Sequence, residues 1–332
     1  MSIVKSDNDK GNPYHSGETG QFVSAYGDAT SSKEKTLPIS SNAKIKIEKD
    51  FLPKDKDFFI DFNSPEQKEK VKLNEKKYLD RFGQKMLKID YNFENYNTMK
   101  KARENPERLI EDKKKVEKYL DEQVREKGIP ANRECTFFLG LPGAGKSFFV
   151  KNSDQKFLEA DADIFKDMIP EFQQDENMVS AVHNESVFMF NHFQEEAMKK
   201  GLNIAIGKVG GDSRQIEKSI KQMIAAGYNV KIKAVLVSQS TAVDRAINRY
   251  DKGTTRRVVP FDVFNSGNGI IETLNRAMNE GWASEIEIYD NDIPRGSEPI
   301  LLNKGKTNNS IKFSNFKKSL EEDKAKKMFN LK

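Results

Sequence analysis

Residues 140–147 read G-L-P-G-A-G-K-S and constrain this chain more than any other segment, because they match the phosphate-binding P-loop pattern at every required position. A short apolar run precedes them and a helical stretch follows, which is the setting that the motif requires. There the glycines let backbone N–H groups turn toward phosphate oxygens, and the helix presents its positive N-terminal end. Lys146 is expected to reach the outer phosphates, and Ser147 to offer its hydroxyl to Mg²⁺. The predicted phosphate-binding residues are Gly140, Pro142, Gly143, Ala144, Gly145, Lys146 and Ser147. An ordinary glycine-rich turn before a helix is the alternative.

Short apolar runs alternate with amphipathic helical stretches from Glu134 onward, a pattern typical of crossover units and a parallel sheet. Strands are predicted at 135–139, 157–160, 203–207, 230–237 and 285–289. Helices are predicted at 175–200, 213–226, 240–250 and 268–280, with a last charged helix near 315–329. The sequence therefore predicts an α/β fold in which helices flank a parallel sheet.

The segments on either side of this region have a different character. Residues 1–50 are rich in polar residues with few apolar ones, which predicts a disordered arm. Residues 51–130 predict a small helical module, in which Ser64 and Pro65 open one helix and Asn105 and Pro106 open another. The apolar face predicted for the first helix consists of Val71, Tyr78, Leu79, Phe82 and Met86. We assign the P-loop domain to residues 131–295 and a polar tail with a terminal helix to residues 296–332.

Composition excludes several classes of protein. The 56 Lys and Arg residues nearly balance the 51 Asp and Glu residues, so a net charge of +5 indicates no nucleic-acid partner by itself. Cys135 is the only cysteine, which excludes an internal disulfide framework and a CxxC zinc site. No apolar run approaches the ~18 residues of a membrane span, and the polar start is no signal peptide. We therefore expect a soluble, cytoplasmic protein without a membrane partner.

Two carboxylates follow the second predicted strand, in the segment F-L-E-A-D-A-D-I-F. Asp161 and Asp163 would lie at the carboxyl end of a strand next to the P-loop, where ligands bind in open α/β sheets. Alternate spacing places both on the same side of the strand. A carboxylate there can hold the water shell of a metal, for which Asp161 is the candidate, or accept the proton of a substrate hydroxyl. Helix capping by either Asp is the alternative.

Three arginines lie in the segment A-I-N-R-Y-D-K-G-T-T-R-R-V-V-P, at the end of a predicted helix and in the loop after it. Phosphoryl transfer spreads negative charge over the equatorial oxygens, and guanidinium groups on a lid can neutralise that charge without titrating. The candidates are Arg249, Arg256 and Arg257. On spacing alone, solvated surface arginines are the favoured alternative.

Further segments accompany these motifs. The segment D-A-D-I-F-K at 161–166 is followed by Pro170. Further along the chain come K-K-G-L-N-I-A-I, then I-N-R-Y, and then R-R-V-V-P. Together with the P-loop, they make residues 134–290 resemble the zeta-toxin kinases. Those are P-loop small-molecule kinases that phosphorylate a sugar hydroxyl of UDP-N-acetylglucosamine with ATP and Mg²⁺. The resemblance implies a P-loop kinase-like α/β fold, with ATP and Mg²⁺ as cofactors.

The resemblance also implies a role for each matching residue. Asp163 would be the base that receives the hydroxyl proton, and Ser147 would be a contact for the nucleotide and its metal. Arg249 and Arg257 match the phosphate-clamping arginines of the family, and Arg256 is the adjacent alternative. The implied catalytic residues are therefore Asp163, Lys146, Arg249 and Arg257.

The chain departs from the family pattern after N-I-A-I. The family carries an acidic residue, Gly and Thr that contact the sugar nucleotide, whereas this chain reads G-K-V at 207–209. The substrate-binding Glu of the family falls at Asn191, and Glu185 and Glu195 are alternatives in a different helix register. Another nucleotide or a dinucleotide cofactor is therefore an alternative acceptor.

The predicted arm has a resemblance of its own. Residues 12–24 read N-P-Y-H-S-G-E-T-G-Q-F-V-S and are similar to a segment at the termini of phage head-morphogenesis proteins and phage-borne effectors. That likeness implies a phage-borne gene and an arm that docks to a head or portal component. A generic turn-rich tail is the alternative on composition.

These observations predict first an ATP-dependent phosphotransferase that phosphorylates a hydroxyl of a small metabolite, such as a nucleotide sugar or other nucleotide. An antitoxin is a candidate partner for such a protein. Two alternatives stay open. One is a polynucleotide end kinase, for which the lysine-rich residues 66–127 would supply charge, although nucleic acid is the less favoured partner. The other is a virion-associated structural or interaction protein with a degenerate nucleotide site.

Overall fold

The computed structural model describes residue 58 and residues 63–90, 97–255, 258–294, 296–305 and 313–321. The chain divides into two units, residues 1–44 and residues 45–332, and every described residue belongs to the second. The predicted arm, with its segment from Asn12 to Ser24, lies outside the described residues. Arg256 and Arg257 lie outside them as well.

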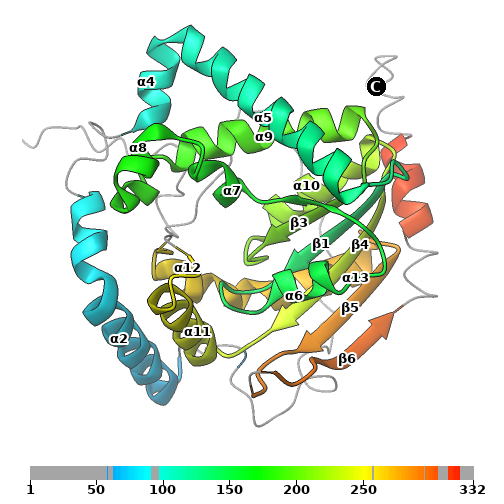
Figure 1. Cartoon of the computed structure of the whole chain (residues 1–332). Coiled ribbons are helices and arrows are strands. Elements are labelled where there is room, and N and C mark those ends of the chain that lie inside the picture. The colour runs from blue at the N-terminus through cyan, green and yellow to red at the C-terminus, as the bar shows by residue number, and fades with distance from the viewer. Residues whose placement is uncertain are drawn as a thin grey trace, which may run out of the picture. The chain divides into compact units, whose positions relative to one another are not determined.

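A six-stranded sheet in the order β2-β3-β1-β4-β5-β6 organises the second unit (Figure 1). Its strands are β1 (Glu134–Leu139), β2 (Leu158–Ala160), β3 (Ile204–Lys208), β4 (Asn229–Leu236), β5 (Glu285–Asp290) and β6 (Ile300–Gly305). In this order, each neighbouring pair of strands from β2 through β3, β1 and β4 to β5 is parallel. Strand β6 pairs antiparallel with β5. The predicted α/β fold with a helix-flanked parallel sheet is confirmed, and each predicted strand begins and ends within one residue of the observed one.

Strand β6 is the one strand that the sequence analysis missed, because it assigned this segment to a polar tail. Its apolar run is short, and Ile300 and Leu301 are 52% and 45% exposed. Antiparallel pairing with β5 holds it, and the ammonium of Lys304 adds ion pairs, 2.5 Å from Glu287 and 3.3 Å from Glu285 on β5. Ion pairs between distant segments leave no periodic signal in the sequence, so this edge strand could not be read from hydropathy.

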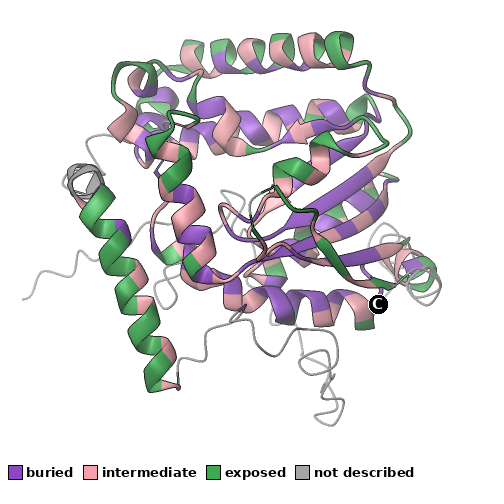
Figure 2. Ribbon diagram, turned by 60° about the horizontal axis from the view of Figure 1, so that its bottom comes forward, coloured by how far each residue is buried: buried purple, intermediate pink, exposed green. Residues whose placement is uncertain are grey.

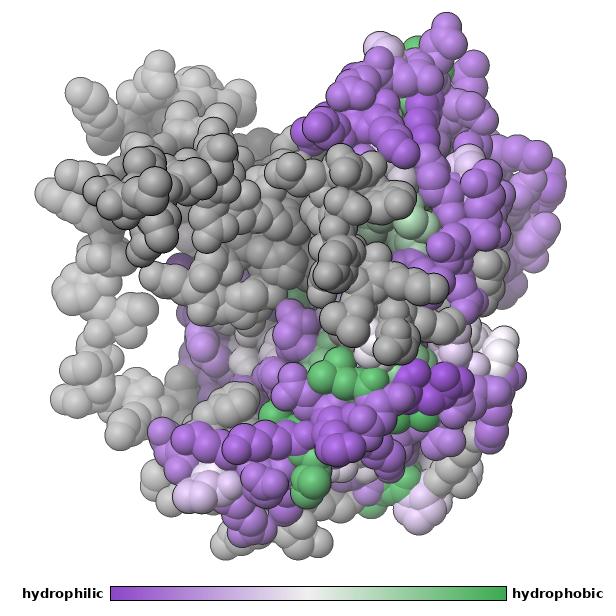
Figure 3. Space-filling view, turned by 90° about the vertical axis from the view of Figure 1, so that its left-hand side faces the viewer, coloured by the Kyte–Doolittle hydropathy of each residue, from purple (hydrophilic) through white to green (hydrophobic). Residues whose placement is uncertain are grey.

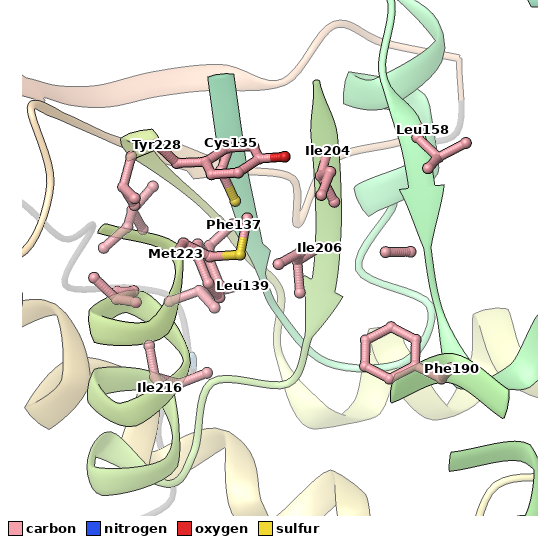
Figure 4. Packing of buried hydrophobic residues seen from close by; sticks show 14 of the residues in the cluster. Cys135, Phe137, Leu139, Leu158, Phe190, Ile204, Ile206, Ile216, Met223 and Tyr228 are labelled. Atoms are coloured by element: carbon pink, nitrogen blue, oxygen red, sulfur yellow. The ribbon is translucent and has the colours of Figure 1, made fainter. Parts of the chain in front are cut away.

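Each face of the sheet carries its own hydrophobic cluster. The larger cluster, part of which Figure 4 shows around Cys135, joins alternate strand residues to three long helices. These are α9 (His183–Lys199), α10 (Ser213–Ala225) and α13 (Gly269–Glu280). On the opposite face, Phe138 and Ala205 pack with Phe149 of α6 (Lys146–Lys151). Figure 2 shows that the strands of the sheet are largely buried. β1 is accordingly a nearly continuous apolar run, whereas β4 alternates buried apolar residues with the half-buried Lys231 and Lys233.

Shorter helices connect the strands to these long ones. They are α7 (Ala162–Lys166), α8 (Pro170–Gln174), the 3-10 helix η1 (Glu176–Val179), α12 (Asp262–Asn265) and the 3-10 helix η2 (Ser266–Asn268). The helix predicted at 175–200 is therefore two elements, η1 and α9. Asp175 sets the start of η1, because its carboxylate accepts the N–H of Asn177 at 2.9 Å and caps that helix. The break between η1 and α9 falls at residues 180–182. Of the predicted terminal helix, residues 313–321 are described and are helical.

In the described part of the chain before the sheet lie three helices: α2 (Pro65–Asp90), α4 (Thr98–Glu104) and α5 (Pro106–Lys127). The N–H of Gln67 donates to the hydroxyl of Ser64 at 3.4 Å, which is the predicted cap of α2. α5 packs along α9, whereas α2 packs along α11 (Gln239–Asp251). The predicted helical module thus lies directly on the P-loop body, at two separate places.

The contact of α2 with α11 uses one narrow stripe of the helix. Tyr78 and Phe82 are 1% exposed, and the Tyr78 hydroxyl donates to the carbonyl of Val259 at 2.7 Å. Arg81 pairs with Asp251 at the end of α11. The prediction for Leu79 was wrong, because its side chain is 40% exposed. Figure 2 shows that most of α2 faces solvent.

No helix in the described part of the chain is long and apolar enough to cross a membrane. On the face that Figure 1 shows at its left, the described residues are mostly hydrophilic, with small hydrophobic areas among them (Figure 3).

Candidate active site

The P-loop joins β1 to α6 in the conformation that its glycines require. The N–H of Gly140 donates to the carbonyls of Lys208 and Val209, each at 3.1 Å, which ties the start of the loop to the end of β3. A Cβ on Gly140 would lie 2.5 Å from the carbonyl oxygen of Val235, so a larger residue does not fit there. Gly143 has a φ of 82°, a region that favours glycine. The motif residues therefore form a tight loop at the carboxyl end of β1.

Two residues that the sequence analysis did not single out brace this loop. The amide of Asn291 donates to the carbonyl of Ala144 at 2.6 Å. The guanidinium of Arg245 donates to the carbonyls of Asn291 at 2.9 Å and Ile293 at 3.0 Å. Both side chains reach the loop from distant parts of the sequence. Of these two residues, only Asn291 had a signal in the sequence, because it lies two residues after a predicted strand.

Lys146 begins α6, and its ammonium folds back onto the loop. It donates to the carbonyl oxygens of Gly140 at 2.7 Å and Leu141 at 3.1 Å. Burial lowers the pKa of Lys146 to about 8, and the negative charges of Asp161 and Asp163 oppose that shift. A buried ammonium held by neutral carbonyls gains a stronger, charge-assisted partner when a phosphate oxygen replaces them.

Asp161 and Asp163 lie at the carboxyl end of β2, as predicted, but at a helix start instead of along a strand. Asp161 is the N-cap of α7, and its Oδ1 accepts the N–H of Asp163 at 2.9 Å. Asp163 lies in the first turn, where its Oδ1 is 2.8 Å from the ammonium of Lys166. Burial and the charge of Asp163 raise the pKa of Asp161, although its side chain still reaches solvent. The capping alternative therefore holds for Asp161, whereas Asp163 is a helical residue in front of the P-loop lysine.

Arg249 lies in the last turn of α11 and is exposed. Its positive charge lowers the pKa of Lys146, so the two side chains lie within electrostatic range. Of the predicted arginines, Arg249 is thus the one described residue whose charge acts on the P-loop lysine. Arg256 and Arg257 follow seven and eight residues later, outside the described residues.

The end of β3 forms the other side of the site. A Cβ on Gly207 would lie 3.9 Å from Cε of Lys146, so this residue faces the P-loop. The ammonium of Lys208 lies over the ring of Phe190 on α9, 5.0 Å from its centroid. Burial lowers the pKa of Lys208, and the charge of Asp161 opposes that shift. Asp161 therefore acts on both lysines, Lys146 and Lys208.

The α9 residues that were considered for the acceptor differ in their surroundings. Glu185 is fully buried, and Arg108 donates to its two oxygens at 2.6 and 2.8 Å. The same guanidinium bonds both oxygens of Glu171, at 2.9 and 2.8 Å. Glu185 is thus committed to an ion-pair network that joins α5 to α8 and α9. Asn191 is half-buried, and Glu195 is exposed.

The donor set near the P-loop fits a magnesium ion that is carried by a nucleotide. The part of the chain that the structure describes has no group of three or more His, Cys, Asp or Glu that could hold a metal by themselves. Mg²⁺ binds proteins through one or two carboxylates together with substrate phosphates and water. The exposed hydroxyl of Ser147 and the carboxylate of Asp161 are oxygen ligands of that kind.

A P-loop at the carboxyl end of a central parallel strand, with acidic residues at the end of a nearby strand, defines a P-loop nucleotide-binding protein with a kinase fold. Residues 120–295, more than half of the chain, match the family model described as zeta toxin. The chain belongs to the zeta toxin family.

Solved structures with similarity to this chain include one from the PezAT chromosomal toxin-antitoxin system of the human pathogen Streptococcus pneumoniae. It is 16% identical, with a TM-score of 0.49, and the match covers 67% of this chain and 96% of that one. Another is AvrRxo1-ORF1:-ORF2 with ATP, at 14% identity and a TM-score of 0.46, covering 64% of this chain and 70% of that one. The comparison with curated proteins gave no significant match.

Proposed function

We propose that this protein is an ATP-dependent phosphotransferase that moves the γ-phosphoryl group of ATP to an alcohol hydroxyl of a small metabolite. One observation carries the proposal. The ammonium of Lys146 lies close enough to the carboxylates of Asp161 and Asp163 for each charge to change the pKa of another. A phosphate-binding cation therefore stands beside a carboxylate that can accept a hydroxyl proton. Membership of the zeta toxin family supports this function.

Each charged residue has a distinct task in this reaction. The P-loop N–H groups and Lys146 hold the outer phosphates, and Arg249 with Arg257 neutralises the charge that develops during transfer. Asp163 accepts the hydroxyl proton while the acceptor oxygen bonds to the γ-phosphorus. The bond to the β–γ bridging oxygen breaks, and ADP leaves. Mg²⁺ bound near Ser147 and Asp161 would supply further neutralisation of the phosphates.

The acceptor is the least constrained part of the proposal. UDP-N-acetylglucosamine follows from the family resemblance, whereas the sequence G-K-V at 207–209 favours testing other nucleotides and dinucleotides beside it. An antitoxin partner, a phage origin and a location in the cytoplasm or in a virion stay predictions.

The test is ADP release by the full-length protein with ATP and Mg²⁺, against a panel of nucleotide sugars, nucleotides and dinucleotides. We expect at least one acceptor to be phosphorylated, and Lys146→Ala to abolish the reaction while the melting temperature stays close to that of the wild type. Lys118→Ala is the matched control, because this lysine is 79% exposed on α5. Equal ADP release by Lys146→Ala and wild type would contradict the nucleotide site.

A further inference from the structure

Lys208 is a lysine in the active site that the proposed phosphotransfer does not use. It ends β3 in register with Leu139, the last residue of β1 before the P-loop. Its backbone carbonyl accepts the N–H of Gly140 at the start of the loop. The phosphates of ATP have their own lysine in Lys146. The side chain of Lys208 therefore needs a separate explanation.

The side chain of Lys208 lies on the α9 side of the sheet. Successive side chains of a strand point to opposite faces, and Gly207 faces the P-loop lysine. Ile206, on the same face as Lys208, packs in the cluster that contains Phe190. Figure 4 shows Phe190 near the carboxyl end of the strand that carries Ile206. The ammonium of Lys208 thus lies over this ring, within electrostatic range of Asp161 at the start of α7.

The charges around this ammonium do not balance. Asp161 is the carboxylate whose charge stabilises the charged form of Lys208, and it does the same for Lys146. The neighbouring Asp163 already has a cation of its own, the buried ammonium of Lys166 at 2.8 Å. The three ammonium groups of Lys146, Lys166 and Lys208 thus interact with only two carboxylates, Asp161 and Asp163. Partly desolvated cations gain most from a further negative charge.

We propose that Lys208 determines acceptor specificity, its ammonium binding an anionic group, phosphate or carboxylate, of the molecule whose hydroxyl faces Asp163. The inference rests on the proposed phosphotransfer and narrows its substrate class to acceptors that carry such a group. Neutral sugars and nucleosides are disfavoured, because they leave this cation without its partner.

The test measures anion binding to the full-length protein that is saturated with Mg²⁺ and the non-hydrolysable β,γ-imido analogue of ATP, so that the P-loop is filled. Pyrophosphate and malonate are titrated separately by calorimetry. We expect at least one of them to bind the wild type and to bind Lys208→Met at least about tenfold more weakly, because a charge-assisted hydrogen bond is lost. Pyrophosphate alone identifies a phosphate group, and malonate alone a carboxylate.

Three variants separate recognition from folding. Met keeps the length of the lysine stem and can pack on Phe190, so Lys208→Met should retain the fold and bind the ATP analogue as the wild type does. Lys208→Arg should keep anion binding, since it keeps the charge. Lys118→Met, which removes an exposed charge elsewhere, should change nothing.

Every other outcome is decisive as well. If neither anion binds, or if Lys208→Met binds them as the wild type does, the specificity role is wrong while the proposed function stands. If Lys208→Met instead weakens only the ATP analogue, Lys208 belongs to the nucleotide site and the inference is overturned. If the analogue fails to bind the wild type, the proposed function fails and this inference falls with it.

Discussion

Asp112→Asn is expected to stabilise the protein, and to do so more at pH 8 than at pH 5. Asp112 lies on α5 with 1% exposure, and its Oδ2 has no hydrogen-bond donor among the described residues. Burial and a hydrogen bond with the carboxyl group of Glu185 raise the pKa of Asp112 to about 7. Two carboxyl groups can share a hydrogen bond only when one of them is protonated. Folding therefore favours the protonated form of Asp112.

The magnitude follows from the difference between the folded and unfolded pKa. An aspartate in an unfolded chain has a pKa of about 3.9. Between that value and the folded pKa of about 7, the folded protein keeps a proton that the unfolded chain has lost, so stability falls as pH rises. At about 1.36 kcal/mol per pKa unit, the cost is about 1 to 2 kcal/mol at pH 5 and about 4 kcal/mol at pH 8. Asn has the shape of the protonated acid and escapes this cost. Its advantage should grow by about 2 to 3 kcal/mol over that range.

The assay is urea unfolding of wild type and Asp112→Asn at both pH values and one ionic strength. Taking the difference between the two proteins removes the titration of all the other groups. Glu122→Gln, which changes a 40% exposed carboxylate on the same helix, is the control and should show no such growth. An Asp112→Asn effect of equal size at both pH values would refute the assignment of a proton to this buried pair.

Asp163→Asn should cut turnover by ~10² to 10⁴ while binding of the ATP analogue persists, because the proton acceptor is lost. The cap of α7 is Asp161 and stays intact, so full activity of this variant in the ADP assay would exclude Asp163 as the base. Phe82→Ala should destabilise the protein by about 3 to 5 kcal/mol in urea, because it removes a buried ring between α2 and α11. A negligible change would mean that α2 contributes little to the fold. Removal of residues 1–50 should alter neither the melting temperature nor ADP release, since a polar arm buries little surface. A clear drop in melting temperature would show that the arm packs on the body.

The sheet and its P-loop could be predicted because their signals are local. A strand that is buried on both faces must be apolar along its whole length, and a phosphate loop needs glycine at fixed positions. Gly140 shows the second constraint directly, since a Cβ at this position would collide with the backbone carbonyl of Val235 on β4. The carboxylates after β2 followed from the same logic, because the ends of parallel strands meet at one edge of the sheet.

The rest of the site depends on contacts between distant residues. Arg245 and Asn291 brace the P-loop, yet in the sequence one is an ordinary helical arginine and the other an ordinary loop asparagine. Arg108 binds Glu185 across 77 positions, which turned a candidate substrate ligand into a structural residue. Periodicity reports which face of an element is buried but not which partner covers it, so such pairs are found only in three dimensions.

The two edge strands of the sheet affect how copies of this protein can associate. The edge strand β2 is three residues long, shorter than the mean strand of about 5 to 6 residues. The other edge strand, β6, carries Lys304, which pairs with the acidic residues of β5. A long, exposed edge strand would offer its unpaired backbone N–H and C=O groups for pairing with a strand of another chain. Here one edge strand is too short and the other is charged, so association of two copies by pairing of their edge strands is disfavoured. Any self-assembly of this protein should therefore run through its helices and loops, and should respond to changes on those surfaces instead of in the sheet.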